Sequence, residues 1–246
     1  MADPRTSIIE ERLQNIGRII AVSSGKGGVG KSMVAATLAL TLAGKGYRVG
    51  LFDLDFTSPS THIILGVNST QPTENKGLVP PKIKGLEYMS LIYYTGNQPA
   101  PLRGTDTSNA LIELLAITRW SKLDYLIIDM PPGIGDAVLD LIRLVKRIEF
   151  ILVTTPSQLA FETVKKLSSL LLDLNIPILG VIENMKITKE HKIEQQTKKI
   201  GLYFLAEIPY DHKVEESIGN AIALQKTSIA HGTKEIVEAI FAKQTQ

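Results

Sequence analysis

The sequence of 246 residues contains no cysteine. Disulfide bonds, thiolate metal sites and cysteine nucleophiles are therefore excluded within the chain, because each of them needs a cysteine sulfur. An excess of charge of either sign is also lacking, since 27 Lys and Arg stand against 25 Asp and Glu, a formal net charge of +2. So balanced a chain gives no electrostatic reason to expect nucleic acid or an acidic membrane surface as a partner.

Long hydrophobic runs are missing too. Apolar stretches such as LIELLAI at 111–117 fall far short of the ~20 residues that span a bilayer. The N-terminal stretch MADPRTSIIEERLQ has no apolar core of the kind found in secretion signals. We therefore expect a cytoplasmic protein that forms one domain over residues 1–246, in which residues 1–17 are an N-terminal helical extension.

Short, mostly continuous apolar runs alternate with helical stretches along the chain. Continuous apolar runs suit parallel strands covered on both faces, and their alternation with helices implies βαβ units. The expected fold class is therefore α/β, with a doubly wound, mostly parallel sheet, and the Pro-rich stretch 71–84 is expected to be a surface excursion. The expected strands are 19–24, 48–55, 86–91, 125–129, 150–155, 178–184 and 203–209, and the expected helices are 7–15, 32–46 (ending at Gly44 or Gly46), 108–119, 136–147, 158–173 and 233–243.

The segment GKGGVGKS at 25–32 matches the pattern G-x-x-x-x-G-K-[ST], after an expected strand and before an expected helix. Its glycines let backbone N–H groups curl around phosphate oxygens, and the helix adds its positive end. Lys31 should reach the β- and γ-phosphates and the Ser32 hydroxyl should bind Mg²⁺, so ATP with Mg²⁺ is the predicted ligand. A glycine-rich turn without a ligand is the alternative. The residues expected to bind nucleotide here are Gly25, Lys26, Gly27, Gly28, Val29, Gly30, Lys31, Ser32 and Met33.

The second lysine of this loop gives the first resemblance to a known family. KGGVGKS is similar to the deviant Walker A signature of the P-loop ATPases of the MinD, ParA and nitrogenase-iron-protein class. The resemblance implies a homodimer with ATP sandwiched between the subunits, in which Lys26 reaches across to the partner's nucleotide. A cation supplied in this way would stabilise the charge that builds on the transferring phosphoryl group. The alternative is that Lys26 is a solvated loop lysine.

Carboxylates follow two of the expected strands. Asp53 and Asp55 end the second strand, where a period of two allows both to project to one side, and Asp129 ends the run YLIID. By resemblance, Asp55 lies in switch I and orients the attacking water, Asp53 lies near the Mg²⁺ shell, and Asp129 is the Walker B carboxylate that holds a Mg²⁺-bound water. Asp55 could instead cap the following turn. The expected catalytic residues are Lys26, Lys31 and Asp55, and the expected metal residues are Ser32, Asp53, Asp55 and Asp129.

Three further segments resemble parts of the same class. Gly133, in the expected switch II segment PPGIGD, could bring its N–H against the γ-phosphate, since no Cβ blocks the approach. Asn184 resembles the asparagine that binds adenine through its amide, although it could also serve a turn. The segment IPYD resembles the loop around the base, which adds Pro209, Tyr210 and Asp211 to the expected nucleotide site.

Two stretches, PPGIGD and PLRG at 101–104, together with the order of the motifs along the chain, resemble the Mrp/ApbC family of ATPases associated with iron–sulfur cluster carriage. That family typically carries Cys-x-x-Cys shortly after ENM, whereas here KITKEHKIEQQTKKIG follows. Iron–sulfur clusters need thiolate ligands. We therefore expect a slowly hydrolysing, dimeric ATPase of Mrp type that would need a cysteine-bearing partner to serve cluster assembly or transfer.

Two other functions remain open at this stage. One is a MinD/ParA-like positioning protein that cycles on a membrane or on DNA, and its membrane version would need a basic amphipathic C-terminal helix. The last expected helix instead has Ile236, Val237, Ile240 and Phe241 on one short face, which we expect to dock on the core. A module that binds nucleotide without hydrolysing it is the third possibility, and Asp55 argues against it. The four histidines are scattered, and no metal site is expected from them.

Overall fold

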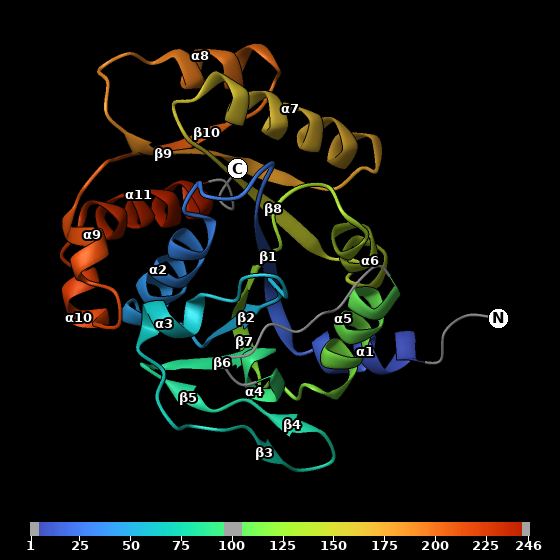
Figure 1. The fold of residues 1–246 in the computed structure, drawn as a ribbon. Coiled ribbons are helices and arrows are strands. Elements are labelled where there is room, and N and C mark those ends of the chain that lie inside the picture. The colour runs from blue at the N-terminus through green and yellow to red at the C-terminus, as the bar shows by residue number, and fades with distance from the viewer. Residues whose placement is uncertain (1–4, 96–104, 243–246) are drawn as a thin grey trace.

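An eight-stranded sheet forms the centre of the computed structural model, which describes residues 5–95 and 105–242 (Figure 1). The strand order is β10-β9-β8-β1-β7-β2-β6-β5, and all neighbours pair in parallel except β5 and β6. This arrangement confirms the predicted α/β, mostly parallel fold. The strands are β1 (Ile16–Ser24), β2 (Val49–Asp53), β5 (Lys82–Ile83), β6 (Leu86–Ser90), β7 (Leu123–Asp129), β8 (Ile148–Thr154), β9 (Ile178–Lys186) and β10 (Phe204–Pro209).

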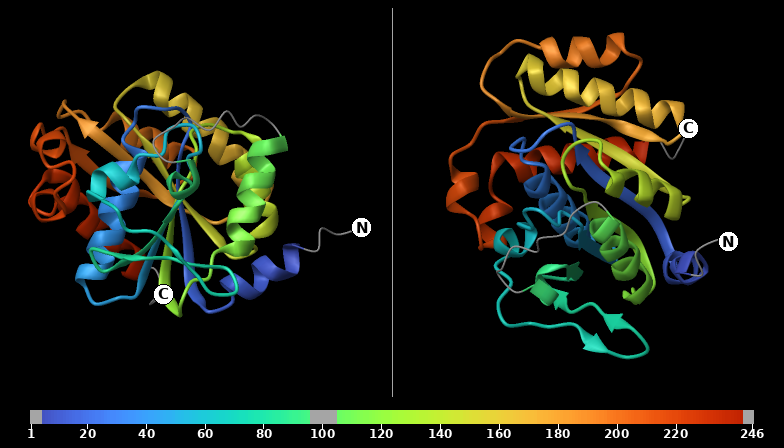
Figure 2. Two further views of the ribbon diagram at one scale, coloured as in Figure 1. Left: turned by 60° about the horizontal axis from the view of Figure 1, so that its bottom comes forward. Right: turned by 45° about the vertical axis from the view of Figure 1, so that its right-hand side comes forward.

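Helices cover both faces of this sheet (Figure 2). Along β1, Ile20 and Val22 point into the hydrophobic cluster shared with α2 and α11, whereas Ile19 and Ala21 point into the cluster shared with α1, α5, α6 and α7. This alternation explains why β1 is apolar on both sides. The longer helices are α1 (Arg5–Leu13), α2 (Lys31–Gly44), α5 (Thr105–Ile117), α6 (Asp136–Leu144), α7 (Gln158–Asp173), α8 (Lys192–Lys199) and α11 (Ser228–Ala242).

The region from 71 to 84 carries small elements that the sequence did not reveal. The strands β3 (Thr73–Glu74) and β4 (Leu78–Val79) form a separate antiparallel pair. Lys84 and Gly85 both have positive φ, of 50° and 86°, and this tight turn folds β5 back onto β6. The predicted surface excursion thus ends by covering one edge of the large sheet with a short antiparallel strand.

Helix α8 was not predicted, because its sequence KIEQQTKK contains one apolar residue. It is anchored by Ile193 and Thr197, which are both buried and lie one helical turn apart. His191, the residue before the helix, lies 3.2 Å from a carboxylate oxygen of Glu207 on β10. The segment after ENM is therefore a helix that packs against the edge of the sheet.

The C-terminal helix α11 starts at Ser228, earlier than the predicted 233. Its residues Ile236, Val237 and Ile240 are buried against α2 and β10, as predicted. Three short helices, α3 (Thr61–Leu65), α9 (Lys213–Glu216) and α10 (Ala221–Leu224), were not predicted, and neither was α4 (Ile92–Thr95). In the described parts of the chain, no helix has both the length and the apolar character needed to cross a bilayer. The segment PLRG at 101–104 lies outside the described residues.

Candidate nucleotide-binding site

The phosphate loop runs from Gly25 to Gly30 between the end of β1 and the start of α2. Gly28 and Gly30 have φ of 77° and 81°, a conformation that L side chains rarely adopt. A Cβ at Gly30 would also lie 2.3 Å from Nδ2 of Asn184, so no other residue fits there. Because α2 begins directly after this loop, its free N–H groups and positive end face the loop, as the sequence predicted for an anion site.

The ammonium group of Lys31 joins two of the predicted carboxylates. Its Nζ lies 2.6 Å from Oδ1 of Asp129 and 3.6 Å from Oδ2 of Asp55, and it donates to Oγ of Ser32 at 3.2 Å. All three charged groups are almost fully buried. Burial raises the pKa of Asp129, and the nearby ammonium opposes that rise. Asp55 and Asp129 are far from the phosphate loop in the sequence, and both meet Lys31 and Ser32 at one point.

Asp53 lies beside this point, directly opposite Asp129 in the register of β2 and β7. Both of its carboxylate oxygens already accept hydrogen bonds, Oδ2 from the hydroxyl and backbone N–H of Thr61 and Oδ1 from the backbone N–H of Asp55. Burial, together with the charge of Asp129, raises the pKa of Asp53 to about 7. Its environment is therefore that of a group that holds the backbone in place.

Asp55 faces a cavity of about 460 Å³ in front of the phosphate loop, which we call the phosphate cavity. Its Oδ1 accepts from the hydroxyl of Thr57 at 2.7 Å and from the backbone N–H of Ser58 at 3.1 Å, so its orientation is fixed. The residues that line the phosphate cavity are Ser24, Lys26, Gly27, Gly28, Val29, Gly30, Lys31, Ser32, Met33, Asp55, Thr57, Ser58, Ser60, Ile63, Ile64, Pro132 and Ile218.

The oxygen atoms around Lys31 fit Mg²⁺. Oδ2 of Asp129 is buried and has no hydrogen-bond partner among the described residues, and the Ser32 hydroxyl lies beside the same ammonium. Carboxylate and hydroxyl oxygens are the ligands that Mg²⁺ prefers, and it keeps several waters or substrate phosphates in its shell. Within the described ranges no three His, Asp or Glu side chains form a group that could hold a metal ion.

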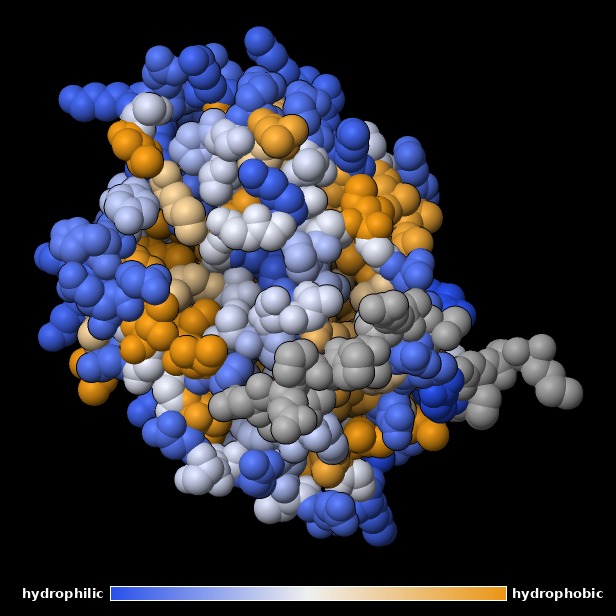
Figure 3. Space-filling view, viewed as in Figure 1, coloured by the Kyte–Doolittle hydropathy of each residue, from blue (hydrophilic) through white to orange (hydrophobic). Residues whose placement is uncertain are grey.

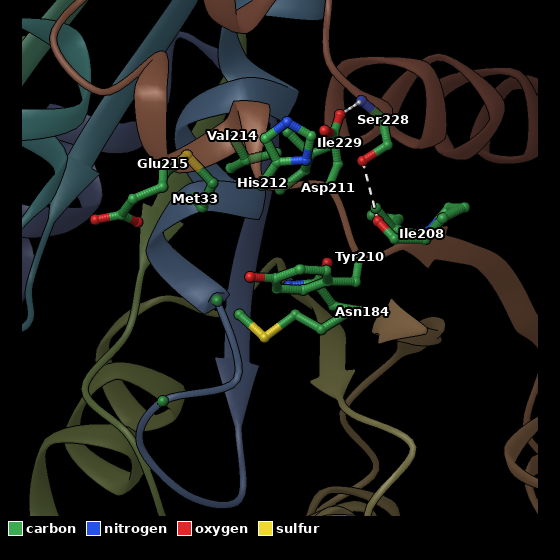
Figure 4. Close-up of a pocket in the computed structure, with 14 residues that line it drawn as sticks. Met33, Asn184, Ile208, Tyr210, Asp211, His212, Val214, Glu215, Ser228 and Ile229 are labelled. Carbon is green, nitrogen blue, oxygen red and sulfur yellow. Dashed lines mark hydrogen bonds between the residues drawn. The ribbon is translucent and has the colours of Figure 1, made fainter. Parts of the chain in front are cut away.

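A second cavity of about 470 Å³ also lies against the phosphate loop (Figure 4), and we call it the base cavity. Nδ2 of Asn184 donates to the carbonyl of Val29 at 2.9 Å, which leaves its carbonyl oxygen as an acceptor for a ligand. Tyr210 and Asp211, two residues of the expected nucleotide site, also line this cavity. The residues that line it are Gly28, Gly30, Met33, Asn184, Met185, Ile208, Pro209, Tyr210, Asp211, His212, Val214, Glu215, Ser228 and Ile229.

Met185 was missed as part of the base cavity. It has a φ of 58°, and the pairing of β9 with β10 is irregular at the same place, between Glu207 and Pro209. This bulge turns Asn184 and Met185 out of the regular strand and toward the phosphate loop. The methyl end of Met185 would lie 3.2 Å from a Cβ at Gly30. Only the polar amide of the neighbouring Asn184 gave a signal in the sequence.

Two further residues of the expected site are Lys26 and Gly133. Gly133 directly follows Pro132, which lines the phosphate cavity. Lys26 lines the cavity, and its ammonium makes no hydrogen bond or ion pair with any residue in 5–95 or 105–242. The N–H of Gly133, whose φ is 87°, donates to the carbonyl of Ser24 at 2.8 Å. A contact between this N–H and a phosphate would need that bond to open, so the role of Gly133 remains a prediction.

The sequence of the chain matches a protein-family model. Residues 15–244 match the ParA model described as the NUBPL iron-transfer P-loop NTPase. The chain belongs to this family. Among curated relatives, the iron–sulfur cluster carrier protein of Pseudomonas fragi is 40% identical over 224 residues, which cover 85% of this chain and 78% of that protein. The carrier protein of Methanocaldococcus jannaschii is 36% identical, with 96% and 88% covered.

Solved structures agree with the assignment to this P-loop NTPase family. A nucleotide-binding protein from Archaeoglobus fulgidus, solved in complex with ADP, superposes with a TM-score of 0.75 at 31% identity, covering 94% of this chain and 92% of that one. The cell division ATPase MinD of Pyrococcus furiosus superposes with a TM-score of 0.71 at 22% identity, covering 92% and 99%. The second likeness concerns the fold alone.

Proposed function

We propose that this protein binds ATP with Mg²⁺ between two copies of the chain and hydrolyses it slowly. The observation that carries the proposal is the buried meeting of Lys31, Asp55 and Asp129 beside the phosphate cavity. A lysine on a phosphate loop, a carboxylate for the metal shell and a carboxylate for water are the parts that phosphoryl transfer requires. The NTPase family and the ADP complex of the Archaeoglobus relative support a nucleotide as the ligand.

Each residue has a separate part in this reaction. Lys31 would leave Asp129 and bind the β- and γ-phosphates. Asp129 and Ser32 would hold Mg²⁺, which would supply the neutralisation of phosphate charge. Asp55 orients the water that attacks the γ-phosphorus while the bond to the β–γ bridging oxygen breaks. Asn184 holds the base through its free carbonyl oxygen. Asp53 supports the backbone of Asp55 through the hydrogen bonds that its two oxygens accept.

Lys26 supports the proposed dimer, because its ammonium lines the phosphate cavity without a partner among the described residues. Apolar side chains exposed at the same edge of the sheet give a second reason: Ile63, Ile134 and Leu159, which are 55%, 46% and 69% exposed, follow β2, β7 and β8. Figure 3 shows orange apolar areas on both sides of a polar hollow. Such a surface around a charged cavity suits a second copy of the chain.

A role in iron–sulfur cluster assembly or transfer is the proposed biological setting, since the curated relatives are named iron–sulfur cluster carrier proteins. The chain has no cysteine to hold a cluster. A cysteine-bearing partner would therefore supply the sulfur ligands, and this chain would supply the nucleotide-dependent step.

Mixing two inactive variants tests the proposal. Lys26→Ala should bind ATP and lose turnover, and Asp55→Asn should bind ATP and stop at the ATP-bound dimer, since the amide keeps the acceptor for Thr57 and Ser58 but not the charge. In a mixed dimer, one site has its own Asp55 and receives an intact Lys26. An equal mixture should therefore regain about a quarter of the wild-type turnover, since half of the dimers carry one complete site.

Lys45→Ala serves as the control, because Lys45 is exposed beyond the end of α2, and it should leave turnover unchanged. Gel filtration and cross-linking establish that mixed dimers form. Turnover at the wild-type rate in Asp55→Asn alone would show that this carboxylate only caps its turn. If mixed dimers form but turnover does not recover, Lys26 does not act across the interface.

A further inference from the structure

The loop of residues 54–60, which carries Asp55 from β2 to α3, is closed at its base by one carboxylate. Oδ2 of Asp53, at the end of β2, accepts from the hydroxyl of Thr61 at 2.5 Å and from its backbone N–H at 3.2 Å. Thr61 is the first residue of α3. Residues on either side of the loop are thus joined directly, and both are almost completely buried.

A third residue, Tyr88 on β6, completes this contact. Its hydroxyl lies 2.9 Å from Oγ1 of Thr61, and the side chain is fully buried. When the Asp53 carboxyl is ionised, the Thr61 hydroxyl gives its proton to it and can only accept from Tyr88. The hydrogen bonds therefore run in one direction, from Tyr88 to Thr61 to Asp53, and we call these three residues the clasp.

The clasp also reaches Asp55. Oδ1 of Asp53 accepts from the backbone N–H of Asp55 at 3.1 Å, so one carboxylate holds the start of the loop with one oxygen and its end with the other. Asp55 in turn accepts from Thr57 and Ser58 inside the loop. The path from Tyr88 to the backbone N–H of Asp55 consists of hydrogen bonds of 2.9, 2.5 and 3.1 Å between buried groups, and such networks hold geometry well.

We propose that Thr61 and Tyr88 are positioning residues for ATP hydrolysis, which act by fixing the loop that carries Asp55. This inference rests on the proposed function, since it assigns Asp55 to the attacking water. Neither residue lines the phosphate cavity or the base cavity. Loss of the clasp should therefore lower turnover and leave nucleotide affinity unchanged, because the phosphate loop and Lys31 keep their contacts.

Two conservative variants remove only the hydroxyl groups. Tyr88→Phe keeps the ring, which packs edge-on against Tyr93 with a centroid distance of 5.9 Å. Thr61→Val keeps the shape of the side chain, and Thr61→Ser keeps its hydroxyl and serves as the rescue variant. The matched control is Thr118→Val, because Thr118 is equally buried but donates to the carbonyl of Leu114 in α5, away from the loop.

Two readouts on the full chain separate positioning from packing. Turnover should fall about fivefold to tenfold in Tyr88→Phe and Thr61→Val, the effect of one lost hydrogen bond, while KM for ATP and Kd for ADP change less than twofold. Amide hydrogen exchange should rise in peptides covering 54–60 and stay constant in peptides covering 23–33. Thr61→Ser and Thr118→Val should match the wild type in both.

Unchanged turnover in folded Tyr88→Phe and Thr61→Val would overturn the inference, and so would a parallel loss of ADP affinity, which would make the clasp a general support of the fold. Failure of the proposed function is distinguishable from these outcomes. If the wild-type protein does not hydrolyse ATP, the proposed function fails. The role of the clasp in fixing the loop is then tested by amide hydrogen exchange in peptides covering 54–60 alone. Exchange that stays at the wild-type level in both variants would rule it out.

Discussion

Lys31 and Asp129 show how single residues of this site depend on one another. Both are buried, and their ion pair of 2.6 Å is the closest contact of either charge in the site. A buried charge is tolerated only with a partner of opposite charge. Removing either side chain would therefore leave the other buried in a low dielectric without its closest partner. The pair therefore links the stability of the empty site to its ability to bind phosphate.

Lys31→Ala should weaken binding of ATP and ADP about tenfold to hundredfold, since it removes a charged hydrogen-bond donor to the phosphates. It should also lower the free energy of unfolding, because Asp129 and Asp55 lose their cation. Isothermal calorimetry and urea denaturation measure the two effects. The exposed Lys45→Ala should change neither, and unaltered nucleotide affinity in Lys31→Ala would contradict the assigned phosphate loop.

Asp53 should make the stability of the protein depend on pH. Its pKa is about 7 in the folded chain, against an ordinary value of 3.8 when unfolded. Between these values the unfolded carboxyl has lost its proton and the folded one retains it, so rising pH favours unfolding. The decline should be at most about 1.4 kcal/mol per pH unit, the effect of one proton.

Urea denaturation between pH 4 and pH 7, without nucleotide, measures this decline. Asp53→Asn should flatten it, because the amide does not titrate in this range. Asp173→Asn, at the exposed end of α7, should leave the slope as in the wild type. An equal slope in Asp53→Asn and the wild type would assign the dependence to other groups.

The charged residues of the site could be read from the sequence, and their supports could not. Asp55 and Asp129 follow apolar strands, and parallel strands bring their carboxyl ends to one edge. Thr61 and Tyr88 are 27 positions apart and carry no local pattern, so only the fold reveals their bond. Met185 was missed because a left-handed conformation within a strand has no signature in an apolar run.

At the scale of elements, the contact of α11 with β10 determines the shape of the base cavity. A Cβ at Gly232 of α11 would lie 2.6 Å from Cγ1 of Ile208 on β10. Only glycine at position 232 therefore allows the helix to approach the strand this closely. Ile208 and Ile229 line the base cavity. The same close contact therefore supports the wall against which the base is expected to pack.

Gly232→Ala should destabilise the protein by about 1–3 kcal/mol, because the added methyl group overpacks this contact. Gly44→Ala is the matched control, since a Cβ at the end of α2 meets nothing within 4 Å, and it should be neutral or stabilising by up to about 1 kcal/mol. Urea denaturation compares the two. Equal effects of the two substitutions would show that α11 can shift without cost.

Predicted elements matched the structure best where burial dictated the sequence pattern. All seven predicted strands are present, because strands covered on both faces must be apolar throughout. Helix α8 was missed because its stability comes from Ile193 and Thr197 packing on the sheet edge, while the rest of its surface is polar. The antiparallel β5 was missed because two paired residues are too few to form a pattern.

For the whole molecule, the absence of cysteine has a direct test. Anaerobic reconstitution with iron and sulfide should leave the purified protein without a cluster after desalting, because carboxylates and imidazoles suit isolated ions better than clusters. Visible absorption and iron analysis measure this. Stoichiometric iron and sulfide retained without a partner would contradict the prediction and would require ligands other than thiolates.

The base cavity is formed by residues that are far apart in the sequence. The loop ends at Gly30, whereas the base cavity is completed only by Ser228 and Ile229 at the start of α11. During synthesis on the ribosome, about 200 residues separate these parts, which at typical rates takes roughly 10 to 40 seconds. A nascent chain therefore contains its phosphate loop long before it can enclose the base of a nucleotide.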